Sequence, residues 1–350
     1  MQASPVFSRP DSSITQGLAD SEFVWHTREL PGTETNPVIA RRFSDEVLVG
    51  LCQTAKEISP IWRYDEAGAA LAEEVSARPE YYLARKEADI LKMNRPLLRE
   101  VLCHASGVIE IGNGRNTTTS LLLDAMDQPS SYVPINISSA VLQQSVSIMR
   151  NCFPEMECLP HHADYRMPMT LPANAGERGQ LVAYCPGSSI ASLMPLESVV
   201  CMQRIRQLLG PDGVLIIGQD TTRIPNVLLP AYDDAGGVSA AFNRNVLARI
   251  NNELAGSFDL ALFHHEARFN HRLGRIETHL ISTASQWVEI SDRAVHFEAG
   301  ESIHTGNAYK YPAEEFLALA QSAGWNSLHT WTDRDSRFAV HVLSASPQTH

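Results

Sequence analysis

Residues 107–116 read Gly-Val-Ile-Glu-Ile-Gly-Asn-Gly-Arg-Asn, a short apolar and β-branched run that ends in glycines. The next ten residues, 117–126, have the composition of a helix. A glycine turn between a strand and a helix lets a ligand approach the backbone closely, and the helix start offers free N–H groups. The stretch therefore predicts the first β-α unit of a ligand-binding α/β domain.

The same alternation continues along the chain. Apolar runs at 132–137, 181–187 and 213–220 are typical of strands, and 138–149 is typical of a helix. We expect the segment around 161–165 to close a further strand, the third in chain order. Strands that alternate with helices at this spacing indicate βαβ units and a parallel sheet. We therefore expect the fold class to be α/β, with a Rossmann-like parallel sheet.

After residue 220 the pattern is mixed. We expect a helix over 240–253, antiparallel strands over 275–283, 287–290 and 294–300, a helix over 313–325, and strands over 328–333 and 338–345. The predicted organisation is an arm or lid (1–40), a helical cap (41–100), the ligand-binding core (101–222), an inserted α+β substrate lobe (223–312) and the completion of the core (313–350).

Charge and composition limit the function. The formal net charge is -12 over 350 residues, and no cluster of Lys or Arg offsets it, so a nucleic-acid partner is disfavoured. No apolar run reaches the roughly 18 residues of a membrane span, and the N-terminus lacks a signal-peptide core. No Cys/His set has metal-ligand spacing. We expect a cytoplasmic monomer or homodimer that acts on a small molecule, without a metal.

Ligands of such sheets bind beyond the carboxyl ends of the strands. Each predicted strand ends in residues suited to binding, and we assign them to a nucleotide-type cofactor, although a plain turn or a helix cap explains any one of them alone. They are Gly112, Asn113 and Gly114 after the first strand, Asn136 after the second, Asp164 and Tyr165 after the third, and Tyr184 and Gly187 at the fourth.

The turn has the form Glu-x-Gly-x-Gly over 110–114, which resembles motif I of the class I methyltransferases. Beyond it, the chain resembles the histidine-specific Nα-methyltransferases of ergothioneine biosynthesis over roughly residues 60–348. The matching stretches are Trp62-Arg63-Tyr64-Asp65, residues 79–82, 85–88 and 121–125, the long run 231–245, and Thr330-Trp331-Thr332-Asp333. This resemblance implies S-adenosylmethionine as cofactor. It also implies a catalytic role for Tyr64, Tyr82 and Tyr232 beside the amino-acid acceptor.

The sequence departs from this family where the substrate is recognised. Ser192 stands in place of an Asn that reads the amino-acid end, Gly306 in place of the imidazole-reading Glu, and Thr278 in place of a Met. Asn243, in the long matching run, is assigned to the same substrate site, and Asn136 replaces the carboxylate that holds the ribose. Each missing hydrogen bond costs about 1–3 kcal/mol of recognition, so histidine is disfavoured as substrate.

Three functions remain open. In the first, an external amine attacks the methyl carbon, which makes the chain an N-methyltransferase of secondary metabolism. In the second, the α-amine of S-adenosylmethionine attacks its own Cγ. That reaction gives azetidine-2-carboxylate and methylthioadenosine, and bacterial azetidine-2-carboxylate synthases are similar to methyltransferases. In the third, the chain is a catalytically silent sensor of S-adenosylmethionine.

Overall fold

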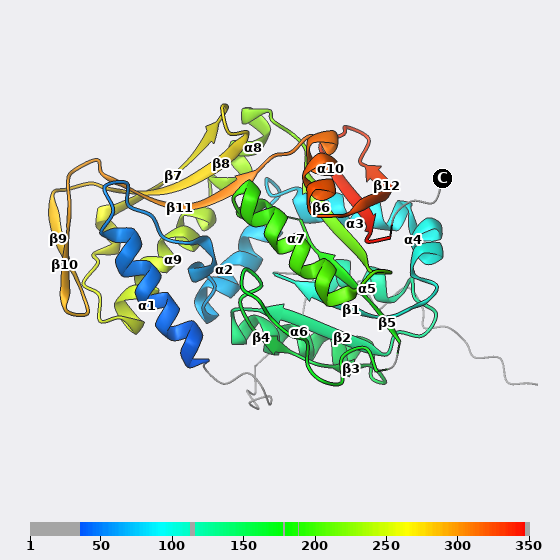
Figure 1. The fold of residues 1–350 in the computed structure, drawn as a ribbon. Helices are drawn as coiled ribbons and strands as arrows, with labels where there is room; N and C mark the ends of the chain where they lie inside the picture. Colours follow the sequence, from blue (N-terminus) through cyan, green and yellow to red (C-terminus); the bar gives the residue numbers. More distant parts are fainter. Residues whose placement is uncertain (1–35, 113–115, 178, 188, 347–350) are drawn as a thin grey trace, which may run out of the picture. The chain divides into compact units, whose positions relative to one another are not determined.

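The structure is a computed structural model that describes residues 36–112, 116–177, 179–187 and 189–346. All of these belong to one unit, residues 31–350. Within it, an eight-stranded sheet with its helices forms a core, and a three-stranded sheet with its helices forms a lobe (Figure 1).

The core sheet has the strand order β12-β13-β6-β5-β1-β2-β3, with β4 also paired to β2. Pairing is parallel from β6 through β5 and β1 to β2, and β13 runs antiparallel to β6 and β12. The strands are β1 (Ala105–Ile111), β2 (Ser131–Asn136), β3 (Glu157–Cys158), β4 (His161–His162), β5 (Gln180–Cys185), β6 (Val214–Asp220), β12 (Asn326–Thr332) and β13 (Phe338–Ser344). The predicted fold class is confirmed, and the order reverses between β1 and β5, where such sheets bind ligands.

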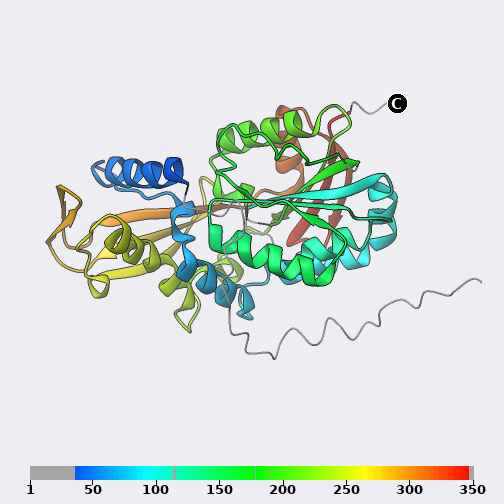
Figure 2. The same ribbon diagram turned by 90° about the horizontal axis from the view of Figure 1, so that it is seen from below.

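Helices cover both faces of this sheet (Figure 2). One face carries α7 (Pro195–Leu209) and α10 (Ala313–Ser322), which contact each other. The other face carries α3 (Leu83–Met93), α5 (Asn116–Leu123) and α6 (Ser139–Cys152), with α4 (Arg95–Leu102) next to α3. The predicted helices over 117–126, 138–149 and 313–325 are confirmed with small shifts at their ends.

The third predicted strand is wrong in its extent. Within 161–165, the strand covers His161 and His162, which form β4, and a separate two-residue strand, β3, precedes it at 157–158; both pair with β2. Pro160 lies between them and has no backbone N–H to donate to the ladder, which explains the interruption.

The lobe is built on the antiparallel sheet β11-β8-β7, joined by the hairpin β9-β10. Its elements are α8 (Pro225–Tyr232), α9 (Val238–Glu253), η4 (Leu260–Leu262), β7 (Phe263–Asn270), β8 (Arg275–Ser282), β9 (Gln286–Ile290), β10 (Arg293–Phe297) and β11 (Ser302–Tyr309). The strands expected near 275, 287 and 294 are β8, β9 and β10. The sequence patterns did not reveal α8, β7 and β11.

The segment expected to be a helical cap is divided between core and lobe. Helix α1 (Pro37–Leu51) and the 3-10 turn η2 (Pro60–Arg63) place Phe43, Val47 and Trp62 in the same apolar cluster as Leu280 and Phe297 of the lobe. Helix α2 (Glu66–Ala77) contacts α9 and α6, whereas α3 packs on α5 and β13. The chain therefore joins the two parts before β1 begins, and the division at residues 41–100 stays a prediction.

In the part of the chain that the structure describes, no helix is long and apolar enough to cross a membrane.

We predict that His341 makes stability depend on pH. His341 is fully buried in β13, its Nδ1 lies 3.1 Å from Thr330 Oγ1, and burial lowers its pKa to about 4. The unfolded chain, with an ordinary His pKa near 6.5, then binds more protons than the folded chain between about pH 6.5 and 4. Stability should therefore fall on acidification, by about 2 kcal/mol from this group between pH 7 and 5.

Urea unfolding of the wild type and of His341→Leu at pH 7 and pH 5 measures this contribution. The variant should lose less stability on acidification than the wild type. Equal losses in the two proteins would contradict it.

Candidate active site

The glycine turn after β1 is tight. Gly112 has a φ of +92°, and a Cβ added there would lie 2.4 Å from Ser189 Oγ in the loop after β5. Only glycine adopts this conformation at little cost, so the sequence requirement is physical. Asn113 and Gly114, also assigned to the cofactor, lie outside the described residues.

Asn136 at the end of β2 secures this turn. Its Nδ2 donates to the Gly112 carbonyl at 3.0 Å, and its Oδ1 accepts from the Ser138 N–H at 2.8 Å. The side chain is buried, at 4% exposure. Its amide therefore already serves two backbone groups, and a contact to a ribose stays a prediction.

Glu110, the acid of the motif, points into the core. Its Oε2 accepts from Tyr132 Oη at 3.0 Å and also from Thr119 Oγ1 of α5. The carboxylate is buried, so hydrogen bonds must offset its desolvation. Glu110 thus fixes α5 against the sheet.

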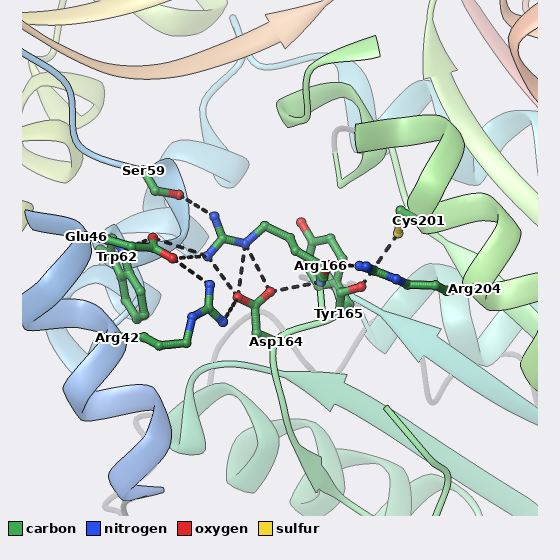
Figure 3. Close-up of polar contacts among 9 residues, drawn as sticks. All are labelled: Arg42, Glu46, Ser59, Trp62, Asp164, Tyr165, Arg166, Cys201 and Arg204. Carbon is green, nitrogen blue, oxygen red and sulfur yellow. Dashed lines mark hydrogen bonds and ion pairs between the residues drawn. The ribbon is translucent and has the colours of Figure 1, made fainter. Parts of the chain in front are cut away.

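Asp164, which follows β4, lies in an ion-pair cluster (Figure 3). Its Oδ2 accepts from Arg42 Nη1 of α1 at 2.6 Å and from Arg166 Nη2 at 2.8 Å, and its Oδ1 accepts from Arg166 Nε at 3.1 Å. Burial alone would raise the pKa of Asp164, but the bonds to Arg166 and Arg42 lower it. The group is therefore anionic, and an adenine amine would have to share oxygens that already accept several bonds.

The same cluster ties α1 and η2 to the core edge. Arg42 also pairs with Glu46 at 2.5 Å, Trp62 Nε1 donates to Glu46 Oε2 at 2.8 Å, and Arg166 Nη1 donates to Ser59 Oγ at 2.9 Å (Figure 3). Sequence patterns gave no sign of this link, because its members are far apart in the chain.

Other assigned residues lie around the loop after β5. Tyr165 is buried and its hydroxyl lies 3.4 Å from the Ser189 carbonyl, which also accepts from Ser192 Oγ at 2.8 Å. The ring of Tyr184 is fully buried, so only its backbone could touch a ligand. Gly187 donates its N–H to both oxygens of Glu87, at 3.0 and 3.2 Å. Glu87, from α3, thereby positions this loop.

A second network joins β6 to the lobe. Lys310 follows β11, and its Nζ lies 2.7 Å from Asp220 Oδ2 and donates to Tyr232 Oη at 2.7 Å. Tyr82 Oη donates to Asp220 Oδ2 at 2.8 Å. Burial, with the charge of Asp220, raises the pKa of Tyr82, and burial raises that of Tyr232. Both therefore remain neutral hydroxyls that can orient an amine but not deprotonate it.

Asn243 and His265 form a hydrogen-bond chain to the backbone of Tyr232. Asn243 Nδ2 lies 2.9 Å from His265 Nδ1, and His265 Nε2 lies 3.0 Å from the Tyr232 carbonyl. Burial lowers the pKa of His265, which fits a neutral ring with its proton on Nε2. Asn243, assigned to substrate, thus reaches the site through His265 and Tyr232.

The remaining assigned residues are Gly306, Thr278 and Tyr64. Gly306 pairs with Thr278 across β11 and β8, and a Cβ on Gly306 would lie 3.0 Å from Arg63 Nη2 and 3.2 Å from Thr278 Oγ1. The ring of Tyr64 meets Phe242 edge-on at 5.2 Å, and the guanidinium of Arg63 lies 4.8 Å from the same ring. The ring of Tyr81 meets that of Tyr232 at 6.2 Å. We call Tyr64, Tyr81, Tyr82 and Tyr232 the tyrosine cluster.

Comparison with known proteins identifies the family of the chain. Residues 43–345 match the family described as "Histidine-specific methyltransferase, SAM-dependent". A histidine N-alpha-methyltransferase of Mycolicibacterium smegmatis (strain ATCC 700084 / mc(2)155) is 33% identical over 304 residues, which cover 85% of this chain and 93% of that protein. The chain belongs to this family of S-adenosylmethionine-dependent methyltransferases.

More distant relatives of this methyltransferase carry other names. The N-methyltransferase imqF of Aspergillus flavus is 23% identical over 307 residues, covering 85% of this chain and 83% of that protein. A solved S-adenosylmethionine-dependent methyltransferase from Clostridium acetobutylicum ATCC 824 aligns with a TM-score of 0.42 and 9% identity, over 75% of this chain and 92% of that one.

The residues at the switch point of this methyltransferase fit its cofactor. The positive-φ Gly112 follows β1 at the switch point. The anionic Asp164 and the ring of Tyr165 follow β4, which lies beyond β2 from β1. S-adenosylmethionine supplies an electrophilic sulfonium when bound. Among the described residues, no group of three His, Cys, Asp or Glu is arranged to hold a metal ion. The sequence prediction missed Arg63, Glu87, Asp220 and Lys310. Asp220 ends a predicted strand, so the rule about strand ends could have found it.

We predict that Gly112→Ala weakens the binding of S-adenosylmethionine about 5- to 30-fold, because a Cβ strains the positive φ and meets Ser189, together costing about 1–2 kcal/mol. Calorimetric titration measures the affinity. In the double variant Gly112→Ala/Ser189→Gly the steric contact is gone and the strain remains, so affinity should recover in part. Wild-type affinity in the single variant would refute the role of the turn.

Proposed function

We propose that this methyltransferase transfers a methyl group to an amino-acid-type amine other than that of histidine. One observation carries the proposal: Gly306 and Thr278, which pair across β11 and β8, stand where the resemblance to the histidine enzymes leads us to expect a Glu and a Met. Neither residue supplies the carboxylate that would accept a charge-assisted hydrogen bond from an imidazole N–H. A substrate with an N–H donor at this position is therefore disfavoured.

The tyrosine cluster supplies the positioning that methylation needs. Methyl transfer requires a neutral amine about 3–3.5 Å from the methyl carbon and in line with the C–S bond. The Tyr82 hydroxyl donates its hydrogen bond to Asp220 Oδ2. Its oxygen can therefore accept a hydrogen bond from an amine N–H. Aromatic faces also attract a sulfonium without offering a competing nucleophile. The amine must arrive already deprotonated, because both hydroxyls stay neutral.

A second candidate is cyclisation of S-adenosylmethionine itself. The α-amine nitrogen forms a bond to its own Cγ, the Cγ–S bond breaks, and sulfur leaves as neutral methylthioadenosine while the amine releases a proton. Asn136 favours this candidate, since its amide is bound to Gly112 and Ser138 and brings no charge to the ribose position. A cofactor bound more weakly at its ribose can more readily adopt the folded conformation in which its α-amine reaches its own Cγ.

Incubation of the purified protein with S-adenosylmethionine alone, followed by mass spectrometry, separates the two. We expect no turnover until an amine is added, and then S-adenosylhomocysteine and an N-methylated product. Methylthioadenosine and a cyclic imino acid without added amine would replace methylation by cyclisation. Binding without either product, across a panel of amino acids, would refute both.

We predict that Asn136→Asp leaves the fold intact and changes the products. The carboxylate loses the donor to the Gly112 carbonyl and adds a charge at the end of β2, which changes the hold on a ribose. The measurement is the rate and the ratio of S-adenosylhomocysteine to methylthioadenosine, with a thermal melt as control for folding. An unchanged rate and ratio would count against a special contact at this position.

A further inference from the structure

Arg63 is the last residue of η2, next to Tyr64, and its guanidinium is the cation on which this inference rests. In the part of the chain that the structure describes, no carboxylate lies within ion-pair distance of its guanidinium, whose polar contact is Nε donating to the Pro60 carbonyl at 3.3 Å. Its neighbours are the ring of Phe242 and the hydroxyls of Tyr64, Tyr81 and Tyr232.

The other cations of the site are balanced. Lys310 pairs with Asp220, and Arg42 and Arg166 pair with Asp164, all at hydrogen-bond distance. Burial lowers the pKa of Arg63, but an arginine stays charged at neutral pH. A desolvated charge without a counter-ion costs free energy, which a ligand of opposite charge can offset on binding.

The space around this guanidinium is also specific. Gly306 has no side chain, and any Cβ there would approach Arg63 Nη2 to 3.0 Å. The glycine therefore keeps a side chain at position 306 from crowding Arg63 Nη2. A guanidinium edge with two N–H groups matches the two oxygens of a carboxylate.

We propose that Arg63 binds a carboxylate of the ligand over Gly306 and Thr278, beside the tyrosine cluster. This inference rests on the proposed function, because it assumes that this face receives the substrate. The carboxylate comes either from an acceptor amino acid or from the methionine part of S-adenosylmethionine. In both cases Arg63 sets specificity by charge, and it excludes cationic side chains from this position.

The test compares the wild type with two variants. Arg63→Met removes the charge with an unbranched side chain, and Arg63→Lys keeps the charge but lacks the two parallel N–H donors of a guanidinium. Arg272→Met, at an exposed arginine in the turn between β7 and β8, is the matched control. Calorimetry measures the affinities of two sets of ligands, each compared in pairs with and without a carboxylate. The first is S-adenosylmethionine against its decarboxylated form. The second, on protein loaded with S-adenosylhomocysteine, is glutamate against glutamine, aspartate against asparagine, and amino acids against their α-amides.

If the acceptor supplies the carboxylate, the wild type should prefer a carboxylate over its amide by about 10- to 100-fold, and Arg63→Met should remove this preference. If the cofactor supplies the carboxylate, the wild type should bind S-adenosylmethionine more tightly than its decarboxylated form, and Arg63→Met should remove this difference. Arg63→Lys should keep part of the preference, and Arg272→Met all of it.

The inference fails if Arg63→Met keeps every preference of the wild type. If Arg63→Met does not fold, Arg63→Lys decides instead, and the inference fails if that variant keeps every preference of the wild type. It also fails if the wild type shows no preference in any pair. The proposed function fails differently, through a wild type that binds S-adenosylmethionine and forms no product.

Discussion

The buried ion pair of Lys310 and Asp220 is the interaction on which the arrangement of the site depends. The two side chains are 1% and 2% exposed, one from the lobe and one from the carboxyl end of β6. Removing one partner of such a pair costs about 3–5 kcal/mol, because the other charge is left buried and unpaired. The pair is tolerated because Tyr82 and Tyr232 bond to it, so the same contacts that satisfy two charges also place two hydroxyls at the predicted acceptor site.

A second connection acts at the cofactor edge. Arg42 of α1 reaches Asp164 of the core, and Arg166 of the core reaches Ser59 beside η2. Charge-assisted bonds of this kind are directional, so they fix the position of the lobe segment as well as its attraction to the core. The segment before β1, including Arg63 and Tyr64, is therefore held against the core by two independent networks.

The sequence predicted what local patterns encode. The apolar run before Gly112 and the glycine itself gave the first strand and its turn, since burial and a positive φ restrict residue types at each position. The contacts of Lys310 could not be read in the same way, because Asp220 lies 90 residues away and Lys310 has no local signal of burial. Arg63 shows the same limit: a charged residue in a helical segment is typically solvated, and only the packing of Phe242 and Gly306 around it shows otherwise.

The two sides of the site differ in how far their polar groups are already satisfied. At the predicted cofactor edge, Asn136 and Asp164 already hydrogen-bond to groups of the protein itself, which favours a preorganised turn. On the lobe side, the neighbours of the Arg63 charge are neutral hydroxyls and an aromatic face, which are weaker partners than a carboxylate. A group already paired gains little from a new ligand, whereas an unbalanced charge gains much. Discrimination between substrates should therefore arise on the lobe side, where this chain departs from the residues expected of a histidine enzyme.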